Sequence, residues 1–82
     1  MTEGEIYERL NTVFHAVFFD DSIHVSAETT APDVDGWDSV AHVNLMVAVE
    51  AEFGVEFTTQ ELESLETVGD MARLVAARTA GR

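Results

Sequence analysis

The feature that most restricts how this chain can fold is residues 40–53, where apolar side chains occupy two faces of one predicted helix. Leu45, Val49 and Phe53 recur every four residues, as in the buried seam of an amphipathic helix. A second stripe, rotated away from this seam, consists of Val40, Val43 and Val47. A helix with two apolar faces is either surrounded by protein or presents one face to a partner. Because 82 residues provide little mass to enclose a helix, we predict that the second stripe is exposed and binds partner proteins.

Three further helices are predicted from capping-box patterns, in which a threonine is followed three residues later by an acidic residue. These pairs are Thr2 with Glu5, Thr58 with Glu61, and Thr67 with Asp70. We expect the first helix to end near Phe19, with Phe18 and Phe19 in the core, and the short third helix to end around Leu65. The second helix should run over residues 39–53, with Gly54 as a left-handed cap. The predicted fold class is therefore all-α: a single domain over residues 1–82, with a long loop between helices 1 and 2 and a short helix 3.

The connection from residue 20 to residue 38 is unusually long for a compact domain, and such loops are commonly functional. It leads into the motif Asp-Gly-Trp-Asp-Ser-Val at residues 35–40. Gly36 can break the chain and Asp38 can cap a helix, so Ser39 is expected in the first turn with an accessible hydroxyl. Free N–H groups and the helix dipole at that position favour an incoming phosphate. Taken alone, a serine at this position would indicate only a helix cap.

The charge of the chain excludes several classes of partner. Sixteen acidic side chains face only four basic ones, all arginine, which gives a net charge of −12. Neither nucleic acid nor an anionic membrane is expected as a partner, because both require clustered Lys and Arg, whereas basic proteins would be attracted. The N-terminal residues lack the pattern of a signal peptide, and no apolar stretch approaches the roughly 20 residues that span a bilayer. We therefore expect a cytoplasmic monomer.

Asp38-Ser39-Val40 stands at a helix start, and the helix that follows ends in Val-Glu-Ala-Glu-Phe-Gly-Val-Glu-Phe. This combination resembles the acyl carrier protein family over nearly the whole chain. In that family the serine of an Asp-Ser-Leu motif carries 4'-phosphopantetheine, and four helices form the bundle. The resemblance implies that Ser39 is the attachment site and that Asp38 assists the modifying transferase. The partner surface that we predict consists of Asp35, Asp38, Val40, Val43, Val47 and Glu50.

The resemblance also implies a carrier that is not an enzyme and has no catalytic residue or metal of its own. A phosphopantetheinyl transferase would supply the chemistry of attachment, with coenzyme A as donor, so Ser39 need not be activated by the protein. Because the chain has no cysteine, the thiol that holds acyl cargo as a thioester has to come with the prosthetic group. The partners implied are acyl-loading enzymes and acyl-modifying or condensing enzymes.

Departures from the family pattern bear on the pathway. Val40 replaces the usual leucine, and Ala41 and Asn44 stand where many fatty-acid carriers have acidic residues. The second departure argues against a housekeeping role in fatty-acid synthesis. Gly-Trp-Asp-Ser followed by His-Val-Asn-Leu is instead similar to discrete carriers of specialised metabolism, so we expect a polyketide or related pathway. A peptidyl or aminoacyl carrier and a fatty-acid carrier stay open as alternatives.

Other chemistries fit the sequence less well. A calcium loop with Gly36 at its sixth position would need ligands at Ala31 and His42, where the essential carboxylates are missing. Ser39 with His42 lacks the Gly-x-Ser-x-Gly elbow of a hydrolase, and the histidines lack the paired spacing of a metal site. We place His42 at the surface or beside the prosthetic group, and Trp37 against the core. The alternative from another class is an acidic helical adaptor whose serine is unmodified.

Overall fold

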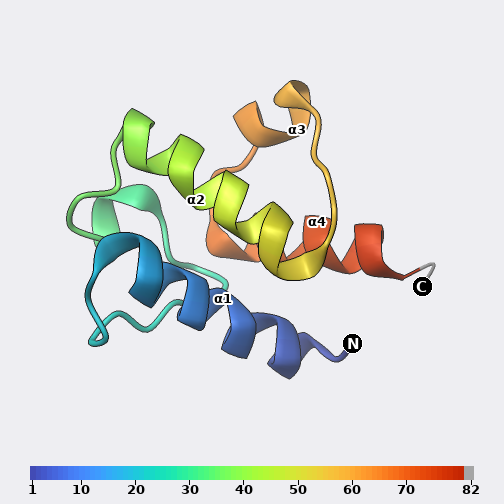
Figure 1. Ribbon diagram of the computed structural model, residues 1–82, viewed down its shortest axis with the longest axis horizontal. Coiled ribbons are helices and arrows are strands. Elements are labelled where there is room, and N and C mark those ends of the chain that lie inside the picture. The colour runs from blue at the N-terminus through green and yellow to red at the C-terminus, as the bar shows by residue number, and fades with distance from the viewer. Residues whose placement is uncertain (81–82) are drawn as a thin grey trace.

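The computed structural model describes residues 1–80, and in this range the chain forms four α-helices and one short 3-10 helix without any strand (Figure 1). The helices are α1 (Glu3–Phe18), α2 (Ser39–Phe53), α3 (Thr59–Glu63) and α4 (Val68–Thr79), and the 3-10 helix η1 (Ala31–Asp33) lies between α1 and α2. This order confirms the predicted all-α bundle with a long loop after the first helix and a short third helix.

The helix starts follow the predicted capping patterns. Three of them are complete capping boxes: Thr2 with Glu5, Thr58 with Glu61, and Thr67 with Asp70. In each, the threonine side chain accepts from the backbone N–H of the acidic residue, and the acidic side chain accepts from the backbone N–H of the threonine. The end of α2 is also as predicted. Gly54 is left-handed at φ 66°, and Val55 N donates to Glu50 O at 3.1 Å, which folds the buried Val55 back on the helix.

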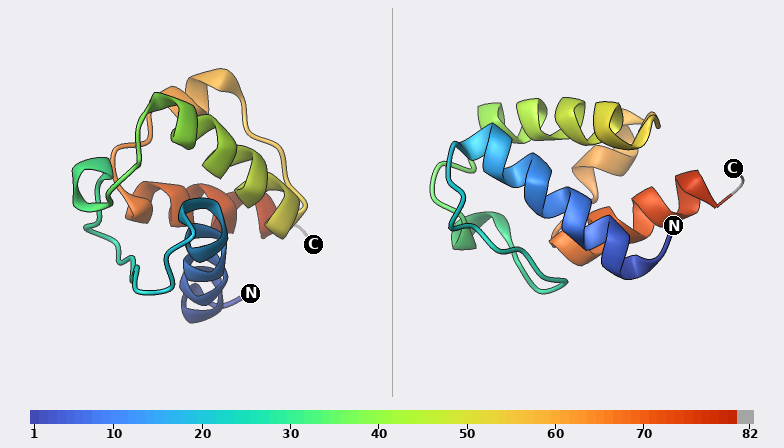
Figure 2. Two further views of the ribbon diagram at one scale, coloured as in Figure 1. Left: turned by 60° about the vertical axis from the view of Figure 1, so that its left-hand side comes forward. Right: turned by 60° about the horizontal axis from the view of Figure 1, so that its bottom comes forward.

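The core lies where α1 packs against both α2 and α4 (Figure 2). Its fully buried side chains are Leu10, Phe14, Val25, Leu45, Met46, Val49, Val68, Met71 and Val75. The predicted seam of Leu45, Val49 and Phe53 is buried, so the register of α2 is confirmed. None of the helices in residues 1–80 is long and apolar enough to cross a membrane.

Two expectations about helix ends need correction. Phe18 packs against the core, but Phe19 is 95% exposed, so its predicted place in the core is wrong. The reason is that Phe19 is the left-handed C-cap of α1, at φ 53°, so it no longer follows the helical register of the apolar stripe. α3 ends at Glu63 rather than around Leu65, because Ser64 turns back and donates through both N and Oγ to Glu61 O.

The long connection is held by hydrogen bonds to α1 and to the first turn of α4. Val25 N donates to Asn11 Oδ1 at 2.8 Å and buries its side chain in the core. Further along, Thr29 O accepts from Val68 N at 2.9 Å, and Ala27 O accepts from Gly69 N at 3.0 Å. These bonds satisfy amides at the start of α4 that the helix itself leaves unpaired. The loop that leads to Ser39 is therefore part of the packed structure.

Candidate functional site

Ser39 is the first residue of α2 and is exposed. The chain reverses just before it at Gly36, where φ is 88°, in the left-handed region that glycine adopts without strain. Asp38 makes the cap, because its Oδ1 accepts from Ala41 N at 2.8 Å and its carbonyl accepts from His42 N at 2.8 Å. The Ser39 hydroxyl takes no part in the cap and has no hydrogen bond within the described residues. It is thus available for reaction with an external group.

Trp37 attaches this helix start to the core, as predicted. Its ring lies edge-on to Phe14, with centroids 5.2 Å apart at 74°, and is 6.3 Å from the ring of Phe18. On its other side, the indole Nε1 donates to His42 Nδ1 at 3.1 Å. Trp37 precedes the N-cap and His42 is the fourth residue of the helix, which are the two positions of a hydrophobic staple.

The Trp37–His42 hydrogen bond was not predicted from the sequence. The signal for it was the staple spacing, which places an indole and an imidazole side by side across the helix start. Both half-buried rings line a shallow cavity of about 400 Å³, together with Ala31, Asp38 and Ser39. The structure thus places His42 and Ser39 along one cavity, and the position of His42 beside a prosthetic group stays a prediction.

The second apolar stripe of α2 is exposed, which confirms its predicted position. Val40, Val43 and Val47 are 72%, 63% and 60% exposed, respectively. We call these three residues the docking stripe. No carboxylate, lysine or arginine occurs on α2 between its N-cap and Glu50, so the stripe lies on an uncharged face. Three large apolar side chains of one helix exposed together are typical of an interaction surface.

The acidic residues around α2 differ in whether their carboxylates bind other groups of the protein. Asp35 is exposed. Glu50 is half-buried and its Oε2 accepts from Phe57 N at 2.8 Å, so this carboxylate holds the chain after α2. Glu52 pairs with Arg9, with Nε to Oε2 at 2.7 Å, and this bond connects the end of α2 to α1. Partner contacts by Asp35 and Glu50 stay predictions.

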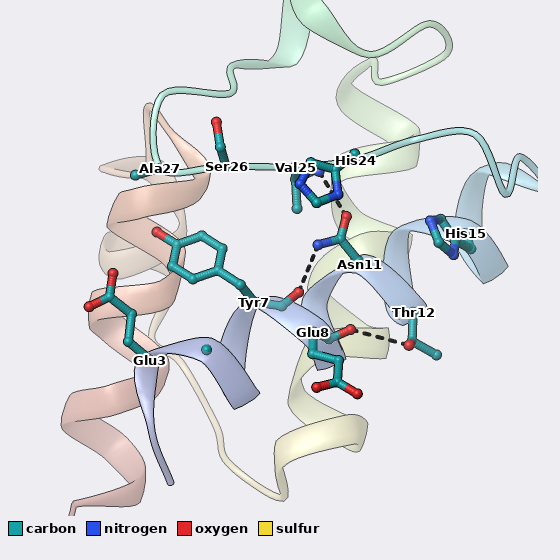
Figure 3. Close-up of a pocket in the computed structure, with 11 residues that line it drawn as sticks. Glu3, Tyr7, Glu8, Asn11, Thr12, His15, His24, Val25, Ser26 and Ala27 are labelled. Carbon is teal, nitrogen blue, oxygen red and sulfur yellow. Dashed lines mark hydrogen bonds between the residues drawn. The ribbon is translucent and has the colours of Figure 1, made fainter.

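A larger hollow of about 670 Å³ lies elsewhere, between α1 and the loop over residues 24–27 (Figure 3). Several of its polar groups serve the fold. Asn11 Nδ2 donates to Tyr7 O at 2.9 Å while its Oδ1 holds Val25 N, and His15 Nε2 lies 2.6 Å from Ile23 O. Ser39 does not line this hollow. Across residues 1–80 there is also no cluster of three or more His, Asp or Glu side chains suited to a metal ion.

Comparisons with known proteins agree with this geometry. The family model for the phosphopantetheine attachment site matches residues 24–75. The acyl carrier protein MbtL of Mycolicibacterium paratuberculosis is 45% identical over 62 residues, covering 70% of this chain and 70% of the relative. An acyl carrier protein of Petrotoga mobilis is 30% identical over 78 residues, covering 95% and 92%. The solution structure of holo acyl carrier protein from Geobacter metallireducens superposes with a TM-score of 0.85 at 43% identity, covering 92% of this chain and 86% of that one.

Proposed function

The chain belongs to the acyl carrier protein family, whose covalent cofactor is 4'-phosphopantetheine, and from this premise we propose that Ser39 is the attachment site. The supporting observation is the state of the serine hydroxyls. Ser22 Oγ donates to Asp20, Ser26 Oγ to Glu28, and Ser64 Oγ to the carbonyl of Glu61. All four serines lie within residues 1–80, and in this range only Ser39 has a hydroxyl that is both exposed and free of an internal hydrogen bond.

The residues around Ser39 fit a phosphodiester. The cap of Asp38 engages the amides of Ala41 and His42, and the N–H groups of Ser39 and Val40 have no hydrogen-bond partner among residues 1–80. Such amides and the helix dipole stabilise a nearby phosphate. Asp38 uses only Oδ1 in the cap, which leaves Oδ2 for the modifying transferase. The prosthetic group supplies the thiol, and this chain supplies its anchor and its orientation.

The carrier then holds acyl cargo as a thioester and delivers it between enzymes of a polyketide or related pathway. The absence of acidic residues on α2 before Glu50 supports this choice, because many fatty-acid carriers have acids at the positions of Ala41 and Asn44. The 82 residues act as one carrier domain, and catalysis belongs to its partners. A peptidyl, aminoacyl or fatty-acid carrier is the alternative within the family.

The first test is modification of Ser39. The protein is incubated with a phosphopantetheinyl transferase, Mg²⁺ and coenzyme A, and its intact mass is measured. We expect the wild-type protein to gain one phosphopantetheine group and Ser39→Ala to gain none. Ser64→Ala removes a different exposed serine and is the matched control, so it should be modified like the wild type. An adaptor with an unmodified serine would show no gain in any of the three.

The second test concerns the docking stripe, with the same transferase as the partner enzyme. Val43→Asp places a charge in the centre of the stripe, so kcat/KM for modification should fall by about tenfold or more. Ala77→Asp introduces the same charge on an exposed position of α4 and should leave the rate unchanged. Circular dichroism should show wild-type helicity for both variants. An unchanged rate for Val43→Asp would exclude the stripe from this interface.

A further inference from the structure

The hydrogen bond between Trp37 and His42 fixes where His42 carries its proton. An indole N–H can only donate, so Nδ1 of His42 has to accept. A neutral imidazole that accepts at Nδ1 has its proton on Nε2, and a protonated ring has no free lone pair with which to accept. The planes of the two rings are nearly parallel, at 16°, with centroids 6.0 Å apart. Trp37 therefore selects the neutral Nε2–H form of His42.

The Nε2–H of His42 is the free polar group of this ring. Within residues 1–80, the side chain of His42 forms only the bond to Trp37, and that bond uses Nδ1. Residues three apart on a helix are neighbours on its surface, so His42 lies one turn beyond Ser39 on the same side of α2. Both residues line the same shallow cavity. A group attached to Ser39 Oγ thus begins beside the His42 ring.

The charged groups around His42 come from two elements. Asp38 at the start of α2 lines the same cavity. Glu66, in the link between α3 and α4, lines a smaller cavity of about 100 Å³ to which Trp37 and His42 also contribute. A proton on Nδ1 of His42 is incompatible with the bond from Trp37. A neutral ring that donates through Nε2 can bind an anionic acceptor that carries no proton. A phosphodiester is such an acceptor.

We propose that His42 is a positioning residue for the prosthetic group: held by Trp37, it donates from Nε2 to a phosphodiester oxygen of the group on Ser39. This inference rests on the proposed attachment at Ser39. The bond holds the root of the arm beside the Trp37–His42 pair at the start of α2.

The test uses the holo protein, labelled with ¹⁵N in histidine and tryptophan, over about pH 5 to 8, where a histidine titrates. We expect His42 to show the Nε2–H tautomer at high pH, and the ³¹P resonance to shift with the same midpoint as His42. The single tryptophan reports on the other partner, since its indole N–H resonance should move with that midpoint too.

Two variants separate this positioning role from a structural one. His42→Gln keeps an N–H donor near the place of Nε2 but cannot titrate, so the ³¹P resonance should become independent of pH in this range. Trp37→Phe keeps an aromatic ring on the core but removes the donor, so a fraction of His42 should populate the Nδ1–H tautomer, which the wild type excludes.

A ³¹P shift in the wild type that ignores the titration of His42, or that persists unchanged in His42→Gln, would overturn the proposal. An Nδ1–H tautomer of His42 in the wild type would overturn it as well. Because the mass of the same sample shows whether Ser39 carries the group, failure of the attachment and failure of the His42 bond are distinguishable.

Discussion

Gly69 is the residue at which the backbone of α4 comes closest to the long loop. A Cβ at this position would lie 2.8 Å from Ala27 O, the carbonyl that accepts from Gly69 N at 3.0 Å. A side chain therefore cannot be added without lengthening this bond or moving the loop. Gly4, near the start of α1, has open space around it, with no atom closer than 3.9 Å to an added Cβ.

This contrast gives a prediction with an internal control. Gly69→Ala should lower the free energy of unfolding by about 1–3 kcal/mol, the usual cost of overpacking a close contact. Gly4→Ala should leave the free energy of unfolding unchanged or raise it by up to about 1 kcal/mol, because alanine favours a helix. Urea unfolding followed by circular dichroism measures both. Equal effects of the two substitutions would show that the contact with Ala27 does not restrict residue 69.

Single residues also show what the sequence can and cannot predict about the site. Ser39, its cap Asp38 and the anchor Trp37 were predictable, because a helix start is defined by neighbours in the chain. The exposed position of Phe19 was not predictable. It depends on α1 ending at Phe18, one residue before Phe19. The Trp37–His42 bond can be predicted only if the two side chains are considered as a pair across the helix start. Considered alone, each side chain has several possible roles.

At the scale of the helices, the capping boxes stabilise the fold through carboxylates. The hydrogen bonds that Asp70 accepts from the backbone N–H groups of Glu66 and Thr67 lower its pKa below the usual value, and Arg73 beside it acts in the same direction. A lowered pKa in the folded state means that the charged form contributes stability above the unfolded pKa. That contribution is lost as the pH falls through the folded pKa of Asp70.

Asp70→Asn tests this linkage, because asparagine cannot titrate. Above about pH 5 the wild type should be more stable than Asp70→Asn by a constant amount, since the carboxylate is charged in both the folded and unfolded states. Below about pH 4 the difference in the free energy of unfolding between the wild type and Asp70→Asn should become smaller, because Asp70 becomes protonated. Free energies of unfolding measured in urea across this range give the result. A difference that stays constant to low pH would mean that the charge of Asp70 is not what stabilises the start of α4.

The starts of the helices were predicted more accurately than their ends. A start depends on a cap and an acidic residue three positions later, as at Thr58 and Glu61, and this information is local. The end of α3 at Glu63 depends instead on the turn that Ser64 makes. The exposure of the docking stripe was predictable because so few residues are available to cover it.

At the scale of the whole molecule, the charges are distributed unevenly. The three arginines within residues 1–80 are all paired: Arg9 with Glu52, Arg73 with Asp70, and Arg78 with Glu61. None lies in α2 or in the loop before it. A partner that approaches Ser39 therefore meets apolar side chains and carboxylates without a competing cation, which favours a basic partner surface.

The attachment of the long loop to α4 could not be predicted from the sequence. Thr29 and Ala27 bind the amides of Val68 and Gly69, which are far away in the chain, and no local pattern indicates such a pairing. These bonds fix the course of the loop that delivers Ser39 to the surface.

The central claim is that Ser39 alone anchors the prosthetic group, and mapping the modified residue tests it most directly. The holo protein is fragmented in a tandem mass spectrometer, and the added mass is assigned to individual residues. We predict that every fragment with the added mass contains Ser39 and that none is modified at Ser22, Ser26 or Ser64. A phosphopantetheine group on any other residue, or on the Ser39→Ala variant, would contradict this account of the site.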